Sequence, residues 1–107
     1  MRKILTLVLA LAVVFALFGA CTAYADDLIT VGIINLDPAE SGYREANVKN
    51  LTDTFTKENG YDATFVTAPI ADKQLEAAKA FITDQVKYIL VSAAETTGWD
   101  EVLEEAK

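Results

Sequence analysis

Histidine is absent from this chain, cysteine occurs once, as Cys21, and the only serines are Ser41 and Ser92. A Ser-His or Cys-His nucleophile therefore cannot be assembled, and histidine metal sites are excluded. A single cysteine allows neither an intrachain disulfide nor a cysteine metal cluster. The glycine spacings of dinucleotide-binding and P-loop motifs are missing as well. We therefore expect no metal, no cofactor and no enzymatic activity.

Basic residues are outnumbered by acidic ones, 9 against 16, which gives a formal net charge of −7. An acidic surface repels a phosphate backbone, so a nucleic-acid partner is not expected. Neighbouring carboxylates occur at Asp26/Asp27 and Glu104/Glu105, but adjacency in the sequence carries no acid–base geometry. We interpret both pairs as solvated surface.

The chain begins with the features of an export signal. Arg2 and Lys3 precede a continuous apolar run, Ile4–Phe18, which is shorter than the ~20 residues of a membrane-spanning helix. Ala23-Tyr24-Ala25 has the small-x-small form that signal peptidase cleaves. Residues 1–25 are therefore predicted to be a signal peptide, and the protein to be periplasmic or exported.

A second cleavage site is the alternative. Phe18-Gly19-Ala20-Cys21 resembles a bacterial lipobox, in which Cys21 becomes the lipidated N-terminus and anchors the protein to the cell membrane. Phe18 stands where a lipobox usually has leucine, so we favour cleavage after Ala25.

The rest of the chain alternates strand-like and helix-like segments. Leu28–Ile34 is a β-branched, nearly unbroken apolar run, which is typical of a strand covered on both faces. Further segments are predicted as strands at 63–67 and 88–91, and as helices at 41–59, 72–85 and from Thr97 onward. Three βα units predict an α/β fold with a parallel sheet between two helical layers. The common strand order for a doubly wound sheet that begins this way is 2-1-3, with the first strand central.

Ligands of such sheets bind at the carboxyl ends of the strands. The order 2-1-3 places residues 35–44 and 92–97 on opposite sides of one cleft. Helix ends are also predicted, with N-caps at Ser41, Asp72 and Thr97 and with Gly60 as the left-handed end of the first helix.

Tyr43 and Arg44 are the candidate ligand-binding residues at this cleft. An aromatic ring suits the C–H face of a sugar, and a guanidinium suits ring or hydroxyl oxygens. In the alternative interpretation Tyr43 packs on the sheet edge, and Arg44 is solvated or paired with Glu40. Trp99 falls on the apolar stripe of its helix, so we expect it in the core.

The third predicted strand has no neighbour on its outer side. Natural proteins avoid an exposed apolar strand edge, so we interpret residues 26–107 as the front portion of a larger protein. A small domain that dimerises edge to edge is the alternative.

Several short motifs follow one another behind the export signal: 31–34, 40–44, Gln74, 79–82, 88–91 and 97–99. In order and spacing they resemble the periplasmic sugar-binding proteins of ABC transporters, of the ribose/galactose type and nearest to the galactofuranose-binding branch. The resemblance implies a type I periplasmic-binding-protein fold, of which residues 26–107 would be a partial N-terminal lobe. In that family two lobes close on one monosaccharide, which a membrane permease then receives.

The resemblance also implies a ligand and a site. Tyr43 would stack on the sugar and Arg44 would hydrogen-bond it, with Glu40, Ser41 and Asn35 in the matching loop. The implied ligand is a monosaccharide such as galactofuranose or a related hexose or pentose, and the implied partner is an ABC permease. The family's Asp-Arg pair and its second lobe have no counterpart here. The chain alone is therefore expected to bind sugar weakly or not at all, since unpaired hydroxyls are costly.

Two other functions stay open. A sensory module of the same fold would present a bound sugar or signalling molecule to a membrane receptor kinase. A small secreted domain of flavodoxin-like topology would instead be marked by a catalytic constellation at the cleft, and the sequence shows none.

Overall fold

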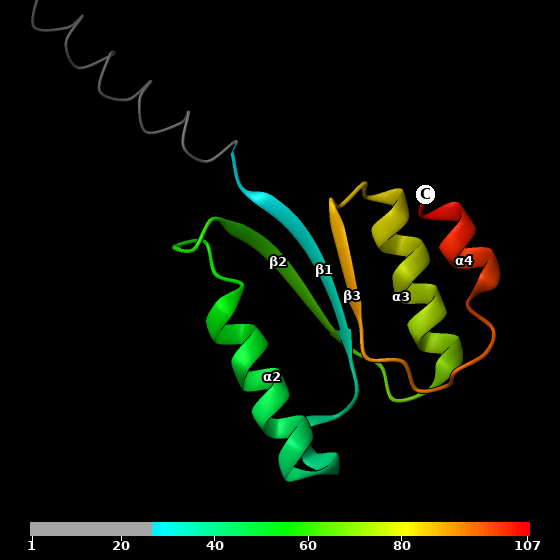
Figure 1. The fold of residues 1–107 in the computed structure, drawn as a ribbon, viewed down its shortest axis with the longest axis horizontal. Coiled ribbons are helices and arrows are strands. Elements are labelled where there is room, and N and C mark those ends of the chain that lie inside the picture. The colour runs from blue at the N-terminus through cyan, green and yellow to red at the C-terminus, as the bar shows by residue number, and fades with distance from the viewer. Residues whose placement is uncertain (1–26) are drawn as a thin grey trace, which may run out of the picture.

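The computed structural model describes residues 27–107, drawn as a ribbon in Figure 1. The predicted signal peptide, residues 1–25, and the alternative lipidation site at Cys21 lie outside the described residues. The described elements are β1 (Ile29–Asn35), the 3-10 helix η1 (Pro38–Glu40), α2 (Gly42–Thr54), β2 (Tyr61–Thr67), α3 (Ala71–Thr83), β3 (Tyr88–Val91) and α4 (Asp100–Glu105).

Strand β1 lies at the centre of a three-stranded parallel sheet of order β2-β1-β3. In the middle of the sheet Ile33 is paired with Phe65 of β2 and with Leu90 of β3. Figure 1 shows α2 on one side of this sheet and α3 with α4 on the other. The α/β class, the three layers and the strand order 2-1-3 are therefore confirmed.

Side chains of β1 alternate between the two helical layers because successive strand residues point to opposite faces. Gly32 faces α3, where a Cβ on this residue would stand only 2.5 Å from ring atoms of Phe81. Asn35 faces α2, where its side chain is hydrogen-bonded to Asn47. With both faces covered, β1 is buried from Val31 to its end, as its unbroken apolar run predicts.

The main core lies between the sheet and α3 with α4. Its buried members are Ile34, Ala68, Ala78, Phe81 and Val102. Half-buried Trp99 packs against this cluster, as its position on the apolar stripe predicts. A glycine at position 32 allows the Phe81 ring to lie directly on the sheet.

The opposite layer is thinner. Helix α2 contains no fully buried residue, although its stripe of Val48, Leu51 and Phe55 is half-buried. Phe55 meets Tyr61 of β2 edge to face, with ring centroids 4.9 Å apart. An amphipathic helix is held mainly by its packed face, so α2 is the most weakly packed of the long helices.

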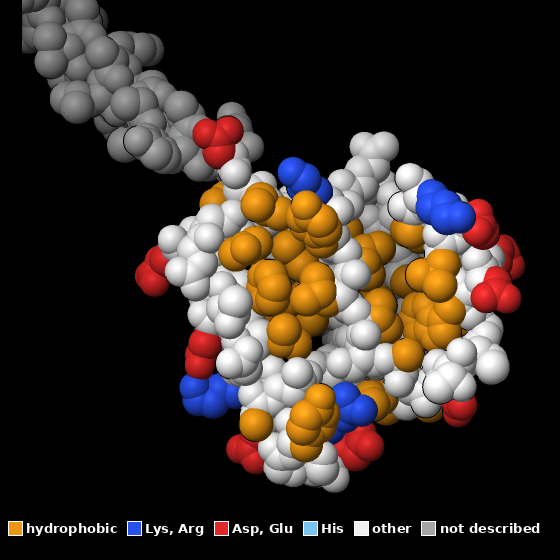
Figure 2. Space-filling model, viewed as in Figure 1, with side chains coloured by type: hydrophobic (Ala, Val, Ile, Leu, Met, Phe, Trp, Pro, Cys, Tyr) orange, Lys and Arg blue, Asp and Glu red, His pale blue; other side chains and the backbone are white. Residues whose placement is uncertain are grey.

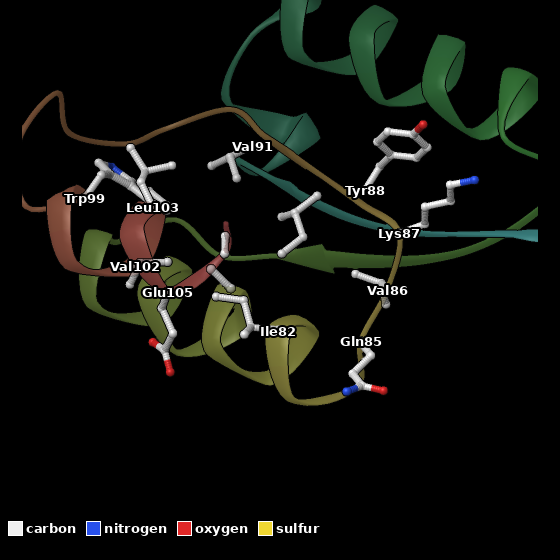
Figure 3. A pocket seen from close by; sticks show the side chains of 13 residues that line it. Ile82, Gln85, Val86, Lys87, Tyr88, Val91, Trp99, Val102, Leu103 and Glu105 are labelled. Carbon is white, nitrogen blue, oxygen red and sulfur yellow. The ribbon is translucent and has the colours of Figure 1, made fainter.

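The outer edge of β3 is open within the described residues. Tyr88 is 54% exposed and Val91 is also exposed. An apolar groove of about 500 Å³ runs between β3 and α4, with Trp99 and Leu103 at one end and Val86 and Tyr88 toward the other (Figure 3). Figure 2 shows hydrophobic side chains gathered over the sheet and over the α3–α4 side of the molecule.

Several predicted helix ends are wrong. The first helix ends at Thr54 rather than Asn59, and Gly60, with a φ of +94°, lies in a turn that leads into β2. β2 accordingly begins two residues early, at Tyr61, because its pairing with β1 extends to Ile29↔Tyr61. The long-range ladder has decided this boundary, not the local turn.

Two predicted N-caps are wrong as well. Ile70 occupies the N-cap of α3, so Asp72 lies inside the first turn, where its charge favours the positive helix end. Trp99 occupies the N-cap of α4, and Thr97 lies before it in the loop. Neither helix has a side-chain hydrogen bond at its cap. Both helices carry buried residues instead, Gln74 and Ala78 in α3 and Val102 in α4, so tertiary packing stabilises them without a side-chain cap.

Candidate functional site

Three loops meet at the carboxyl edge of the sheet. They border a hollow of about 520 Å³ that is lined by Leu36, Asp37, Ala39, Glu40, Pro69 and Ala94. Segments 35–44 and 92–97 thus both border the hollow, as the strand order predicts. The loop after β2, represented by Pro69, forms a third side that the sequence did not indicate.

Asn35 ends β1 and is only 5% exposed. Its Nδ2 donates to Asn47 Oδ1 of α2 at 2.7 Å, and its Oδ1 accepts from the Leu36 backbone N–H at 2.8 Å. Both polar atoms of the side chain are therefore used inside the protein. Asn35 orients the first loop and α2, and its direct contact with a ligand stays a prediction.

Gln74, which the sequence analysis named only as part of the family resemblance, is a residue of the site. It extends from α3, has no exposed surface, and lies beneath the loops that follow β2 and β3. Its Nε2 donates to the backbone oxygens of Ala68 at 3.1 Å and Ser92 at 2.9 Å, and its Oε1 accepts from Ala94 N at 2.8 Å. The available signal was a lone amide on the apolar face that also carries Ala78 and Phe81.

The loop between β1 and α2 is shaped by two side-chain caps. Asp37 accepts from the Ala39 N–H at 2.9 Å and begins η1. Ser41 accepts from the Arg44 N–H at 3.2 Å and caps α2, as predicted. Glu40, at the end of η1, is exposed and lines the hollow with its neighbour Ala39.

Tyr43 and Arg44 lie in the first turn of α2 and contact each other. The Arg44 guanidinium carbon is 5.5 Å from the centroid of the Tyr43 ring, a distance typical of a cation–π contact. Tyr43 is 70% exposed, so it is not packed on the sheet edge. Neither residue lines the hollow, which Glu40 reaches instead. The pair thus presents an aromatic face and a guanidinium in the first turn of α2, outside the lining of the hollow.

A smaller hollow of about 280 Å³ lies between β1, β3 and α2, with Ile33, Asn47, Leu90 and Ser92 among its lining residues. It opens next to the carboxyl edge because Ser92 follows β3 directly. Its mainly apolar lining gives few hydrogen-bonding partners for a sugar. The larger hollow, with Asp37 and Glu40, is the better candidate.

Charged pairs in the described part of the chain lie on helix surfaces. They join Lys49 to Asp53, Lys73 to Glu76 and Lys107 to Glu104. Hydrogen bonding and charge attraction from Asp53 raise the pKa of Lys49 above its usual value. Arg44 and Glu40 form no ion pair with each other in residues 27–107, so their charges are available to a ligand.

Among residues 27–107 there is no group of three or more histidine, cysteine, aspartate or glutamate side chains that could hold a metal ion. In the same stretch no helix combines the length and the apolar character needed to cross a bilayer.

Known proteins similar to this chain are sugar-binding proteins. A fructose import binding protein, FruE, from Bifidobacterium longum is 37% identical over 79 residues, which are 72% of this chain and 24% of that protein. No protein-family model matches the chain.

Solved structures agree in sequence and in fold. A periplasmic arabinose-transporter binding protein from Shewanella sp. ANA-3, bound to arabinofuranose, is 32% identical with a TM-score of 0.66 over 72% of this chain and 25% of its own. A Mycobacterium smegmatis protein in complex with β-D-fucofuranose is 36% identical with a TM-score of 0.65 over the same shares. A galactofuranose-binding protein is 28% identical with a TM-score of 0.64, over 73% of this chain and 26% of its own. The chain thus spans about a quarter of the length of the relatives it matches.

Proposed function

We propose that this chain is part of the solute-binding component of a carbohydrate importer. The proposal rests on its similarity to the periplasmic sugar-binding proteins of ABC transporters. The substrate class we propose is a monosaccharide in its furanose form, since several structural relatives were solved with furanoses or are named for one. The proposed partner is a membrane ABC permease, and the proposed location is periplasmic or exported.

The site we propose is the hollow at the carboxyl edge with the Tyr43–Arg44 pair beside it. Tyr43 offers an exposed ring for the C–H face of a sugar, and Arg44 offers several N–H donors. Glu40 supplies a carboxylate acceptor from the same loop, and Ser41 shapes that loop through its cap. The single observation that supports this assignment most strongly is the exposed aromatic–guanidinium pair in the first turn of α2, directly after the loop that lines the hollow.

Binding can be tested by titrating the isotopically labelled chain with L-arabinose, D-fucose, D-galactose and D-fructose while its amide NMR signals are recorded. We expect one sugar to shift the signals of residues 36–44 and 92–97 with a millimolar Kd. Such a Kd corresponds to about 4 kcal/mol of binding free energy, which is consistent with a site of few polar partners. Signals that do not respond to any of the four sugars, or shifts confined to other residues, would overturn the site proposed on this chain.

Tyr43→Ala should abolish these shifts because it removes the stacking surface. Tyr88→Ala is the matched control, since Tyr88 is also an exposed aromatic residue and lines the β3 groove instead of the hollow. We expect it to bind as the unmodified chain does. Equal loss in both variants would show that the aromatic at position 43 has no particular role.

A further inference from the structure

Gln74 connects the loops that border the hollow, and it does so from below the sheet edge. Its amide bonds to Ala68, in the loop after β2, and to Ser92 and Ala94, in the loop after β3. Ala94 itself lines the hollow, and Ala68 precedes Pro69, which lines it too. One buried side chain therefore holds two of the three loops in place.

Both loops are also bonded through the backbone to the end of β1. Ala68 N–H donates to the Asn35 carbonyl at 2.9 Å, so the Ala68 peptide bonds to β1 on one side and to Gln74 on the other. Ser92 N–H likewise donates to the Ile34 carbonyl at 2.9 Å while its own carbonyl accepts from Gln74. These bonds fix the loops after β2 and β3 against the end of β1, from which the third loop, with Leu36 and Glu40 of the hollow, departs.

The chemistry of an amide suits this position. Nε2 has two N–H groups and each finds a backbone carbonyl, while Oε1 receives the Ala94 N–H. A buried amide with all its partners is rigid, and loss of one group leaves carbonyls or an N–H unpaired. A leucine or methionine of similar size would satisfy the core but would not connect the loops.

We infer that Gln74 is a positioning residue for the ligand site: it fixes the loops after β2 and β3 against each other and against the end of β1, without touching the ligand. This inference rests on the proposed sugar-binding function for its effect on affinity. The arrangement of the loops can be measured independently of any sugar.

The sugar-independent measurement is hydrogen exchange of single amides. Ala94 lies in an irregular loop, where amides normally exchange fast. Because its N–H is bonded to Gln74, we expect its protection to approach that of β1 amides, while Thr97 in the same loop exchanges fast. In Gln74→Met the protection factor of the Ala94 amide should fall at least tenfold. Fast exchange of Ala94 in the unmodified chain would overturn the inference, even if Gln74→Met does not fold.

The sugar-dependent measurement uses Gln74→Glu, which keeps the size and Oε1 but removes both donors. We expect at least a tenfold loss of affinity. Gln85→Glu makes the same chemical change at an exposed position and should leave affinity within twofold. Val102→Ala removes core packing away from the hollow, so at a temperature where it is still folded it should also retain affinity.

The outcomes are distinguishable. Equal affinity of Gln74→Glu and the unmodified chain would overturn the inference and leave the proposed function intact. Equal losses of affinity in Gln74→Glu and Val102→Ala would show that Gln74 contributes only to the overall stability of the fold. That result would also overturn the inference. If the unmodified chain binds no sugar, the site proposed on this chain fails and the exchange of Ala94 alone decides the loop-positioning role.

Discussion

At the scale of single residues, this fold depends on a few positions where size or polarity is tightly constrained. Gly32 is one of them, because the Phe81 ring occupies the space that any side chain would need. Gln74 and Asn35 are the others, since each is a buried polar side chain with its donors and acceptors paired. In each case the constraint comes from a partner far away in the sequence.

Gly32→Ala should destabilise the protein by about 1–3 kcal/mol, the usual cost of overpacking a filled core. The new Cβ would stand 2.5 Å from Phe81 ring atoms, and the ring lies between the sheet and α3 with little room to move. Urea unfolding followed by circular dichroism measures the change.

Gly42→Ala is the control for this substitution. A Cβ at Gly42, the first residue of α2, would meet no heavy atom within 4 Å. We expect unchanged or slightly raised stability, because alanine has less conformational freedom to lose than glycine. A Gly32→Ala protein as stable as Gly42→Ala would contradict the close contact with Phe81.

At the scale of elements, the two helical layers differ in how they are held. α3 carries the buried residues Gln74, Ala78 and Phe81, whereas α2 has none that is fully buried. The position of α2 therefore depends more on its ends, namely the Ser41 cap and the Asn35–Asn47 hydrogen bond. Since Tyr43 and Arg44 lie in its first turn, the same contacts place the candidate ligand residues.

Ser41→Ala should destabilise α2 by about 1 kcal/mol, because the Arg44 N–H loses its acceptor. Amide exchange in the first turn, at Arg44 and Glu45, should accelerate more than exchange in α3. Ser41→Asp keeps an acceptor and adds a favourable charge at the helix N-terminus. In this variant the amides of Arg44 and Glu45 should exchange at the rates of the unmodified chain. Equal acceleration in α2 and α3 would show that the cap acts on global stability only.

At the scale of the whole molecule, an acidic surface encloses a small core. The formal net charge is −7, and self-repulsion of like charges opposes the compact state. The open β3 edge adds apolar groups such as Tyr88 and Val91 that contribute little to burial. The net charge predicts a stability that responds to the salt concentration, because salt screens repulsion between charges.

Raising sodium chloride from 10 to 150 mM should raise the midpoint of thermal unfolding by a few degrees. The Debye length falls from about 30 Å to about 8 Å over this range, so repulsion between distant carboxylates is screened. Glu58→Lys lowers the acidic excess at an exposed residue and should show a smaller salt response. A midpoint that falls with salt would mean that ion pairs such as Lys49–Asp53 outweigh the repulsion.

Much of this architecture was determined by the sequence alone. The apolar run of β1, the β-α-β-α-β-α order, the strand order 2-1-3, the Ser41 cap and the core position of Trp99 follow from local pattern and general rules of α/β folds. The relationship to periplasmic sugar-binding proteins followed from motif order and is confirmed by relatives at 37% and 36% identity.

The tertiary structure alone decided the rest. Strand β2 begins at Tyr61 because it is paired with Ile29. Helices α3 and α4 begin at Ala71 and Asp100 without side-chain caps from Asp72 and Thr97, and buried residues pack them on the sheet. The role of Gln74 became visible only when residues 68, 92 and 94 met around its amide. The local sequence specifies which element a segment forms. Strand pairing and burial bring together residues that lie far apart in the sequence, so their joint role cannot be inferred from local pattern.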